Sequence, residues 1–333
     1  MSLTSIFSLI KGRREPKISN ADIARFAEEV VNLKHEAAAD YLHQISLLDA
    51  QLYLFAIRNP DQGFLHTELH GSLAHGTATK SISKIDIAFY FKPNMSTLTE
   101  AELLDHVANC IASACPHIEP SQIEPNEHTV LIEGFISGQN VEVMPVILEA
   151  GAQGLGYHFA FGAMPIFTST ALHCQFLQKR KQRHDPHFSQ VVRLVKWWVL
   201  ERTLLDGEFG LGSFAAELIA AHLADHGVKF ANYAAALEQF FSYIAKSELA
   251  ERIAFADYYR PSKVVFAERN PIEILDPVNE MNNIAACYDD FQRMHFVAAA
   301  EEALEALGEA RSATTREAAL ECWQSVLGPS FQG

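Results

Sequence analysis

The sequence has few cysteines, and they are scattered along the chain. The five thiols stand at positions 110, 115, 174, 287 and 322, an odd number without the regular spacing of a disulfide framework. A dispersed set of this kind is typical of reduced thiols in a cytoplasmic protein. We therefore predict a cytoplasmic location.

Long apolar runs are missing as well. No stretch reaches the roughly 18 to 20 apolar residues that a membrane-spanning helix needs. The chain starts MSLTSIFSLIKGRREPK, so its basic cluster follows the apolar part. A signal peptide has the opposite order. The sequence therefore predicts neither a signal peptide nor a membrane partner.

Positive charge is scarce. Lys and Arg total 26 against 41 Asp and Glu, which gives a formal net charge of −15. Proteins bind long duplex nucleic acid by neutralising its phosphates with Lys and Arg, so the negative net charge argues against such a partner. It does not exclude a local basic pocket for a triphosphate. What is present is an ordinary core-forming composition, 49% apolar and 20% charged over 333 residues. That length allows two lobes that share one site, or one large α/β domain.

The first half of the chain combines helix and strand patterns. Apolar residues recur at intervals of three and four over 20–58, which predicts helix with Asn20 as the N-cap. Further predicted elements are strands over 64–70 and 85–91, a helix over 99–114, and a hairpin over 130–147 that turns at Ser-Gly-Gln-Asn.

The character of the chain changes after Glu149. Residues 150–168 are rich in glycine and aromatic residues, and we expect a loop there. From residue 169 the pattern is mostly helical, with an irregular stretch around 257–283. We therefore divide the chain into an α/β part, residues 1–150, and a helical part, residues 151–333, with the site between them.

Three short motifs in the α/β part indicate chemistry on phosphates. They are Gly71-Ser72 in a turn, Lys84-Ile85-Asp86 at the start of a strand, and Glu142 in the second strand of the hairpin. Nucleotidyl transfer needs phosphates held still and charge neutralised, and metal ions bridged by carboxylates can do this. Residues two apart on a strand share a face, so such carboxylates are expected at that spacing. Each motif alone is weak evidence for nucleotidyl transfer. Their order, and the apolar strands on which the carboxylates lie, make the three motifs together more specific.

With these motifs the chain resembles the nucleotidyltransferases related to cyclic GMP-AMP synthase and oligoadenylate synthetase. The most similar group is the bacterial CD-NTases, which make cyclic oligonucleotide signals in anti-phage defence (CBASS). In that family about eleven residues separate Gly-Ser from an acidic-apolar-acidic triplet, as 73–83 do here. Three motifs of the helical part continue the likeness: 193-RLVKWW-198, 212-GSFAAEL-218 and 274-ILDPVNEMNN-283.

The resemblance implies an α+β fold of the DNA polymerase beta-like nucleotidyltransferase type, bilobal, with a mixed β-sheet core and a C-terminal helical lobe. In these terms residues 1–150 are the nucleotidyltransferase core with an N-terminal spine helix. The implied reaction joins nucleoside triphosphates with Mg²⁺ or Mn²⁺. The metal ligands would be Asp86 and Glu142, which are also the catalytic residues. The triphosphate would be held by Gly71, Ser72, Lys196 and Ser213. Protein partners from the defence system are a further implication.

The chain also departs from the family pattern. Lys84 stands where the first metal-bridging acid is expected, Glu142 stands where Asp is usual, and Gly212 replaces a lysine. Lys84 removes a ligand and changes the local charge by two units. The alternative is therefore a catalytically inactive homologue that serves as a nucleotide-binding sensor or regulatory partner. We predict that Lys84 shares a strand face with Asp86 and reaches Asp86 or Glu142.

Other residues near these motifs have a less specific meaning. Glu217 and Asp276 are expected to be structural or to orient the substrate, rather than to catalyse. His70 and His75 flank the Gly-Ser turn. The motifs come from both parts of the chain, so we predict that Ser72 converges with Lys196 and Ser213 on one pocket.

Overall fold

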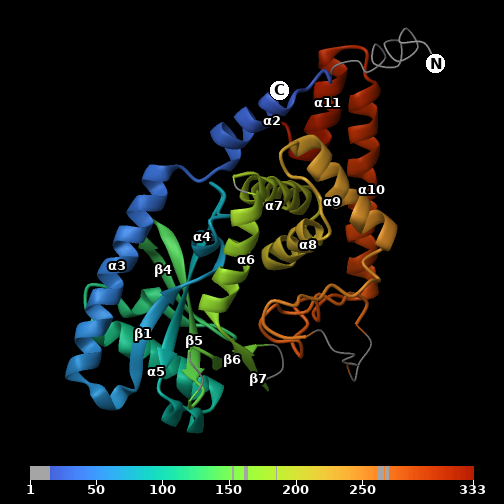
Figure 1. Cartoon of the computed structure of the whole chain (residues 1–333). Coiled ribbons are helices and arrows are strands. Elements are labelled where there is room, and N and C mark those ends of the chain that lie inside the picture. The colour runs from blue at the N-terminus through green and yellow to red at the C-terminus, as the bar shows by residue number, and fades with distance from the viewer. Residues whose placement is uncertain (1–15, 152–153, 161–163, 185, 261–265, 267–269) are drawn as a thin grey trace.

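The computed structural model describes residues 16–151, 154–160, 164–184, 186–260, 266 and 270–333. Strands lie in the first half of the chain and helices dominate the second half (Figure 1). The strands are β1 (Phe64–Leu69), β2 (Lys84–Phe91), β3 (Ile123–Pro125), β4 (Val130–Ile136), β5 (Gln139–Leu148), β6 (Gly156–Ala160) and β7 (Met164–Thr168). The α-helices are α2 (Asn20–Phe26), α3 (His35–Arg58), α4 (Gly71–His75), α5 (Glu100–Ala114), α6 (Thr170–His184), α7 (His187–Leu205), α8 (Ser213–Asp225), α9 (Tyr233–Ser247), α10 (Asp290–Ser312) and α11 (Arg316–Leu327). Of the helices in these described ranges, none has the length and apolar character needed to cross a bilayer.

The strands form one mixed sheet in the order β1-β2-β5-β4-β3, with β6 beside β5 and β7 beside β6. β2 and β5 run parallel, whereas β1 pairs with β2, and β4 with β5, in antiparallel fashion. In the parallel register Lys84 lies opposite Asn140, and Asp86 lies opposite Glu142. The two carboxylates that we expected to act together are therefore neighbours on adjacent strands.

β2 turns one face to the core and the other to the helices of the second half. Its odd-numbered residues, 85–91, are fully buried and pack with α3 and α5 in one hydrophobic cluster. Successive side chains of a strand point to opposite faces, so Lys84 and Asp86 share the other face with Tyr90. The Tyr90 hydroxyl lies 2.8 Å from Thr170 Oγ1 at the start of α6. The sheet alternation thus excludes Asp86 from the core and directs it toward the helices.

A second hydrophobic core joins α2 to the helices of the second half, although α2 is far from them in sequence (Figure 1). Phe26 packs edge-on against Trp197 and Phe331, with ring centroids 6.0 and 5.0 Å apart. After α2 the chain continues through a π-helix, Ala27–Val31, and then enters α3, which packs on the sheet. The two first helices therefore belong to different cores. The division of the chain at residue 150 stays a prediction.

The predicted loop over 150–168 is wrong, because the segment contains β6 and β7. The two strands pair in antiparallel fashion, with Gly156 opposite Thr168. Tyr157 and Phe167 lie opposite each other with ring centroids 5.2 Å apart, a cross-strand aromatic pair of the kind that stabilises hairpins. The aromatic residues of this segment therefore serve as strand residues. The other predicted strands and the hairpin over 130–147 are confirmed by β1, β2, β4 and β5.

The predicted N-cap of the first helix is also wrong by one residue. Ser19 caps α2: its Oγ accepts from the Asp22 amide at 3.2 Å, and Asp22 Oδ2 accepts from the Ser19 amide at 2.8 Å. This reciprocal pair is a capping box. Asn20 instead accepts from the Tyr233 amide at 2.6 Å and so attaches α2 to α9.

Candidate functional site

A cleft of about 750 Å³ opens between the sheet and the helices. One wall comes from α4, β2 and the segment between them, and the other from α7, α8 and part of the segment before α10. The expected site residues that line it are Gly71, Ser72, Asp86, Lys196 and Ser213, and Lys84 lines it too. The predicted convergence of Ser72, Lys196 and Ser213 is therefore confirmed as geometry. Their roles toward a ligand stay predictions.

Gly71 brings the start of α4 directly against β2. Its φ of 64° lies in the left-handed region, and the neighbouring His70 amide donates to the Asp86 carbonyl at 3.0 Å. A Cβ on Gly71 would lie 1.9 Å from Asp86 Oδ2, so a larger residue would have to displace the carboxylate. The Gly-Ser turn therefore packs directly against the Asp86 carboxylate.

Lys84 forms an ion pair with Glu142. Its Nζ lies 2.7 Å from Glu142 Oε2, with side-chain exposures of 48% and 24%. The other carboxylate oxygen, Oε1, accepts from Thr129 Oγ1 at 3.1 Å. The prediction that Lys84 reaches Asp86 or Glu142 is confirmed for Glu142. Lys84 rather than Glu142 is among the described residues that line the cleft.

Asp86 has a pKa raised to about 6. Burial is the main cause, and the neighbouring Glu142 carboxylate adds to it, whereas Lys84 and Lys196 favour the ionised form. Asp86 is therefore half-protonated near pH 6 and ionised above it. A carboxyl group with a shifted pKa on a cleft wall is a frequent mark of a functional site.

The carboxylates do not fit a two-metal arrangement. Asp86 and Glu142 lie in register on adjacent strands, but Lys84 stands where the first of the three acids is expected and already pairs with Glu142. Within the described ranges, no group of three or more His, Cys, Asp or Glu side chains is placed to hold a metal ion. Asp86 and Glu142 are the two expected carboxylate ligands that remain, and the Lys84 ammonium occupies one oxygen of Glu142.

Lys196 is held inside the cleft wall by Glu217. The ammonium donates to Glu217 Oε1 and also to Thr77 Oγ1 at 3.0 Å, and His75 Nδ1 lies 2.8 Å from Glu217 Oε2. Burial alone would raise the pKa of Glu217, but the Lys196 ammonium and the hydrogen bond with His75 lower it to about 2. Glu217 is therefore ionised, and Lys196 is paired rather than solvated.

Ser213 stands at the first position of α8, directly after Gly212. The Gly212 amide donates to the Tyr288 hydroxyl at 2.6 Å, and a Cβ on Gly212 would lie 2.9 Å from that oxygen. A lysine at position 212, as in the family pattern, would therefore displace Tyr288. Among the described residues no side chain caps the start of α8, and helix N-termini in general present amides that suit an anion.

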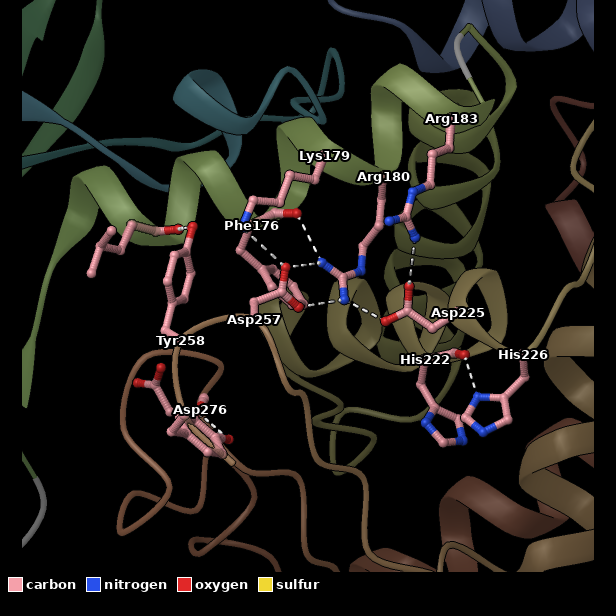
Figure 2. A network of polar contacts seen from close by, with 12 residues as sticks. Phe176, Lys179, Arg180, Arg183, His222, Asp225, His226, Asp257, Tyr258 and Asp276 are labelled. Atoms are coloured by element: carbon pink, nitrogen blue, oxygen red, sulfur yellow. Dashed lines mark hydrogen bonds and ion pairs between the residues drawn. The ribbon is translucent and has the colours of Figure 1, made fainter. Parts of the chain in front are cut away.

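Asp276 enters the cleft from the irregular segment before α10. Its buried carboxylate lies 2.7 Å from His173 Nε2. Arg180 of α6 pairs with Asp257, which lies earlier in that segment, and with Asp225 of α8. Its guanidinium packs on the Phe176 ring, 3.7 Å from the ring centroid (Figure 2). The interpretation of Asp276 as structural or orienting stays a prediction, and its contacts suit that role.

Histidines were only partly anticipated as residues of the cleft. Four histidines line the cleft: His70, His75, His158 and His173. No motif in the sequence indicates a role for His158 or His173. Burial lowers the pKa of His70 to about 3, and the nearby His75 contributes. Among the described residues, no partner lies within hydrogen-bonding distance of the buried His70 Nε2. The imidazole is therefore neutral.

No family model matches the chain. Among characterised proteins, the chain is similar to the cyclic AMP-AMP-AMP synthase of Escherichia coli (strain MS 115-1), with 36% identity over 318 residues, 95% of this chain and 98% of that protein. It is 28% identical over 327 residues to the CBASS oligonucleotide cyclase CdnC of Escherichia coli (strain KTE188), again over 95% and 98% of the two chains. These relatives give no support to the alternative of an inactive homologue, because both are described as a synthase or a cyclase.

Solved structures give the same result. The structure of Escherichia coli MS115-1 CdnC with ATP superposes with a TM-score of 0.89 at 36% identity, over 95% of this chain and 100% of that chain. The same protein in a CdnC:HORMA-deltaN complex gives a TM-score of 0.88 at 36% identity, over 95% and 99%. The predicted bilobal nucleotidyltransferase fold is thereby confirmed. The chain belongs to the CD-NTases, the bacterial nucleotidyltransferases related to cyclic GMP-AMP synthase and oligoadenylate synthetase.

Proposed function

We propose that this chain binds nucleoside triphosphates in the cleft and joins them into a cyclic oligonucleotide that signals in anti-phage defence. The observation that carries the proposal is the placement of Ser72, Lys196 and Ser213 on one cleft with Asp86. ATP is the first substrate to test, because a relative of 36% identity is named a cyclic AMP-AMP-AMP synthase and its structure was solved with ATP.

In this proposal the triphosphate lies between α4 and α8. Gly71 lets the turn approach β2 closely, and the Ser72 hydroxyl and the first amides of α4 can donate to phosphate oxygens. Ser213 offers the same groups from the start of α8. Lys196, between them, supplies a point charge. Donors from three elements would fix the phosphate chain in one orientation, which is the main contribution a protein makes to phosphoryl chemistry.

We further propose Mg²⁺ or Mn²⁺ as the cofactor, held by Asp86 and, after release from Lys84, by Glu142. Oxygen ligands of this kind suit either ion. A bound divalent ion would neutralise charge on the phosphates. The ion pair between Lys84 and Glu142 predicts weaker metal binding here than at a site with three acids.

A protein partner from the same defence system is also proposed. The support is the solved complex of a relative with HORMA-deltaN. Pull-down of the chain with the products of neighbouring genes tests this point separately from the chemistry.

The central test is incubation with labelled ATP, GTP, CTP and UTP and either Mg²⁺ or Mn²⁺, with products resolved by mass spectrometry. We expect a cyclic product that contains adenosine. Asp86→Asn is the matched control, because it keeps the shape of the side chain and removes its charge. Absence of product from the parent under every nucleotide and metal condition, or equal product from the control, would contradict the proposal.

A further inference from the structure

We propose that Glu217 is a positioning residue of the triphosphate site, which holds the Lys196 ammonium in the cleft wall and ties it to the Gly-Ser turn. The inference rests on the proposed function and deepens it. It assigns Glu217 a role that acts through Lys196 and the Gly-Ser turn.

The contacts of Glu217 connect two of the expected phosphate ligands, Lys196 directly and Ser72 through Thr77. Its carboxylate accepts from Lys196 of α7 and from Thr77 Oγ1. The Thr77 amide in turn donates to the Ser72 carbonyl at 2.9 Å. Ser213 lies four residues before Glu217 on α8, hence on the same helix face. The Glu217 carboxylate thus connects the consecutive helices α7 and α8 to Thr77, which lies more than a hundred residues earlier in the sequence.

Burial makes this connection rigid. The side chains of Glu217 and Lys196 are only 2% and 9% exposed, and His75, which approaches the other carboxylate oxygen, is 6% exposed. A buried charge is costly without its partner, so the ammonium and the carboxylate fix each other in place. An ammonium has three donors. Two of them bind Glu217 and Thr77, which leaves one for a phosphate oxygen in the cleft.

This arrangement has a consequence that a purely structural ion pair would lack. In the variant Glu217→Gln, the amide oxygen can still accept a hydrogen bond from Lys196 but no longer supplies an anion, and burial then favours the neutral amine. Phosphate binding by Lys196 would fade as the pH rises. The groups that face Lys196 are Glu217, with His75 behind it, and Asp86 of β2. The Asp86 pKa is about 6, so Asp86 stays ionised over the range from pH 7.5 upward.

The experiment is calorimetric titration of ATP without metal at pH 7.5, 8.5 and 9.5. The variants are Glu217→Gln, Lys196→Ala and, as a matched control, Glu238→Gln on α9, which removes an acid that pairs with Arg311 away from the cleft. We expect constant affinity for the parent and the control. For Glu217→Gln we expect a loss that grows by about tenfold per pH unit, toward the low affinity of Lys196→Ala.

Each outcome decides between the possibilities. A Glu217→Gln variant with the affinity and pH profile of the parent overturns the inference. So does an equal loss at every pH, because it indicates a structural role alone. Failure of the parent to bind ATP would overturn the proposed function, and the inference with it, so the two failures are distinguishable.

A second variant covers the case that Glu217→Gln does not fold, judged by circular dichroism. Glu217→Asp keeps the charge but withdraws the carboxylate by one methylene from Lys196 and Thr77. The expected result is an affinity about tenfold lower than that of the parent, equal at all three pH values, because the anion still sustains the ammonium. Parent affinity in Glu217→Asp would overturn the inference.

Discussion

Replacing Lys84 by aspartate is the sharpest test of the metal site. In the parent, the Lys84 ammonium lies 2.7 Å from Glu142 and competes with a metal ion for that carboxylate. Lys84→Asp removes the competitor and restores an acid two residues before Asp86, on the same strand face. We expect tighter metal binding and an increase in any product formed.

The magnitude follows from charge and exposure. Two unit charges 4 Å apart interact by about 1 kcal/mol in water, and by about 4 kcal/mol at an effective dielectric of 20. Because the Lys84 side chain is 48% exposed, the value for water is the better guide. A change of two unit charges beside a divalent ion then amounts to about 4 kcal/mol before salt screening, and to about 2 kcal/mol with it. This corresponds to about thirtyfold in metal affinity.

The assay is calorimetric titration of Mn²⁺ and Mg²⁺ into protein saturated with a non-hydrolysable ATP analogue at pH 8. Lys84→Met is the matched control: it removes the cation without adding a ligand, so its affinity should rise by only about fivefold. Both variants should remain folded, because a half-exposed ion pair contributes at most about 1 kcal/mol to the free energy of unfolding. Metal affinity within twofold of the parent in both variants would refute the reasoning, and a lowered product yield from Lys84→Asp would make Lys84 a working part of the site.

Three further predictions concern the same cleft. Lys196→Ala should weaken ATP binding by at least about tenfold in calorimetric titration, and unchanged affinity would remove Lys196 from the site. Gly71→Ala should lower the melting temperature and the ATP affinity more than Gly134→Ala does. Both glycines have positive φ, but only a Cβ at Gly71 would meet Asp86. Equal effects of the two substitutions would refute a role for the close approach of Gly71 to Asp86. Metal affinity should increase as the pH rises through about 6 and then level off, because protons compete with the metal for Asp86, whose pKa is raised above its usual 3.8. Metal titrations from pH 5 to 8 check this, and the Asp86→Asn variant should show no such increase.

Local patterns were sufficient to predict much of the sheet and one feature of the site. The alternation of β2 places Asp86 opposite the core, and the same alternation places Lys84 beside it. The reach of Lys84 to Glu142 was predictable, because a long side chain can cross to an adjacent strand. The convergence of motifs from both halves was inferred from a family resemblance, since spacing within one chain does not show which helix faces which strand.

Other features could not be read from local patterns. The hairpin of β6 and β7 was missed because its glycines and aromatic residues suggested a loop, although aromatic residues also suit strands. The ion pair of Lys196 with Glu217 joins two helices, and its partner His75 comes from more than a hundred residues earlier. The capping box at Ser19 has a local pattern, since Asp22 follows three residues later, but serine and asparagine are both favoured N-caps and Asn20 is adjacent.

The attachment of α2 to the second core has a consequence for folding during synthesis. Ile23 and Phe26 are nearly inaccessible to solvent, but Phe26 packs against Trp197 and Phe331, which leave the ribosome much later. The sheet, with α3 and α5, draws its core from residues 41–147 and can form first. The apolar face of α2 therefore stays exposed until Trp197 and Phe331 are synthesised, and contacts between residues so far apart in the sequence form slowly. The first described helix to be synthesised is therefore among the last to be buried, and nascent chains stalled before α11 should be the ones most prone to aggregate.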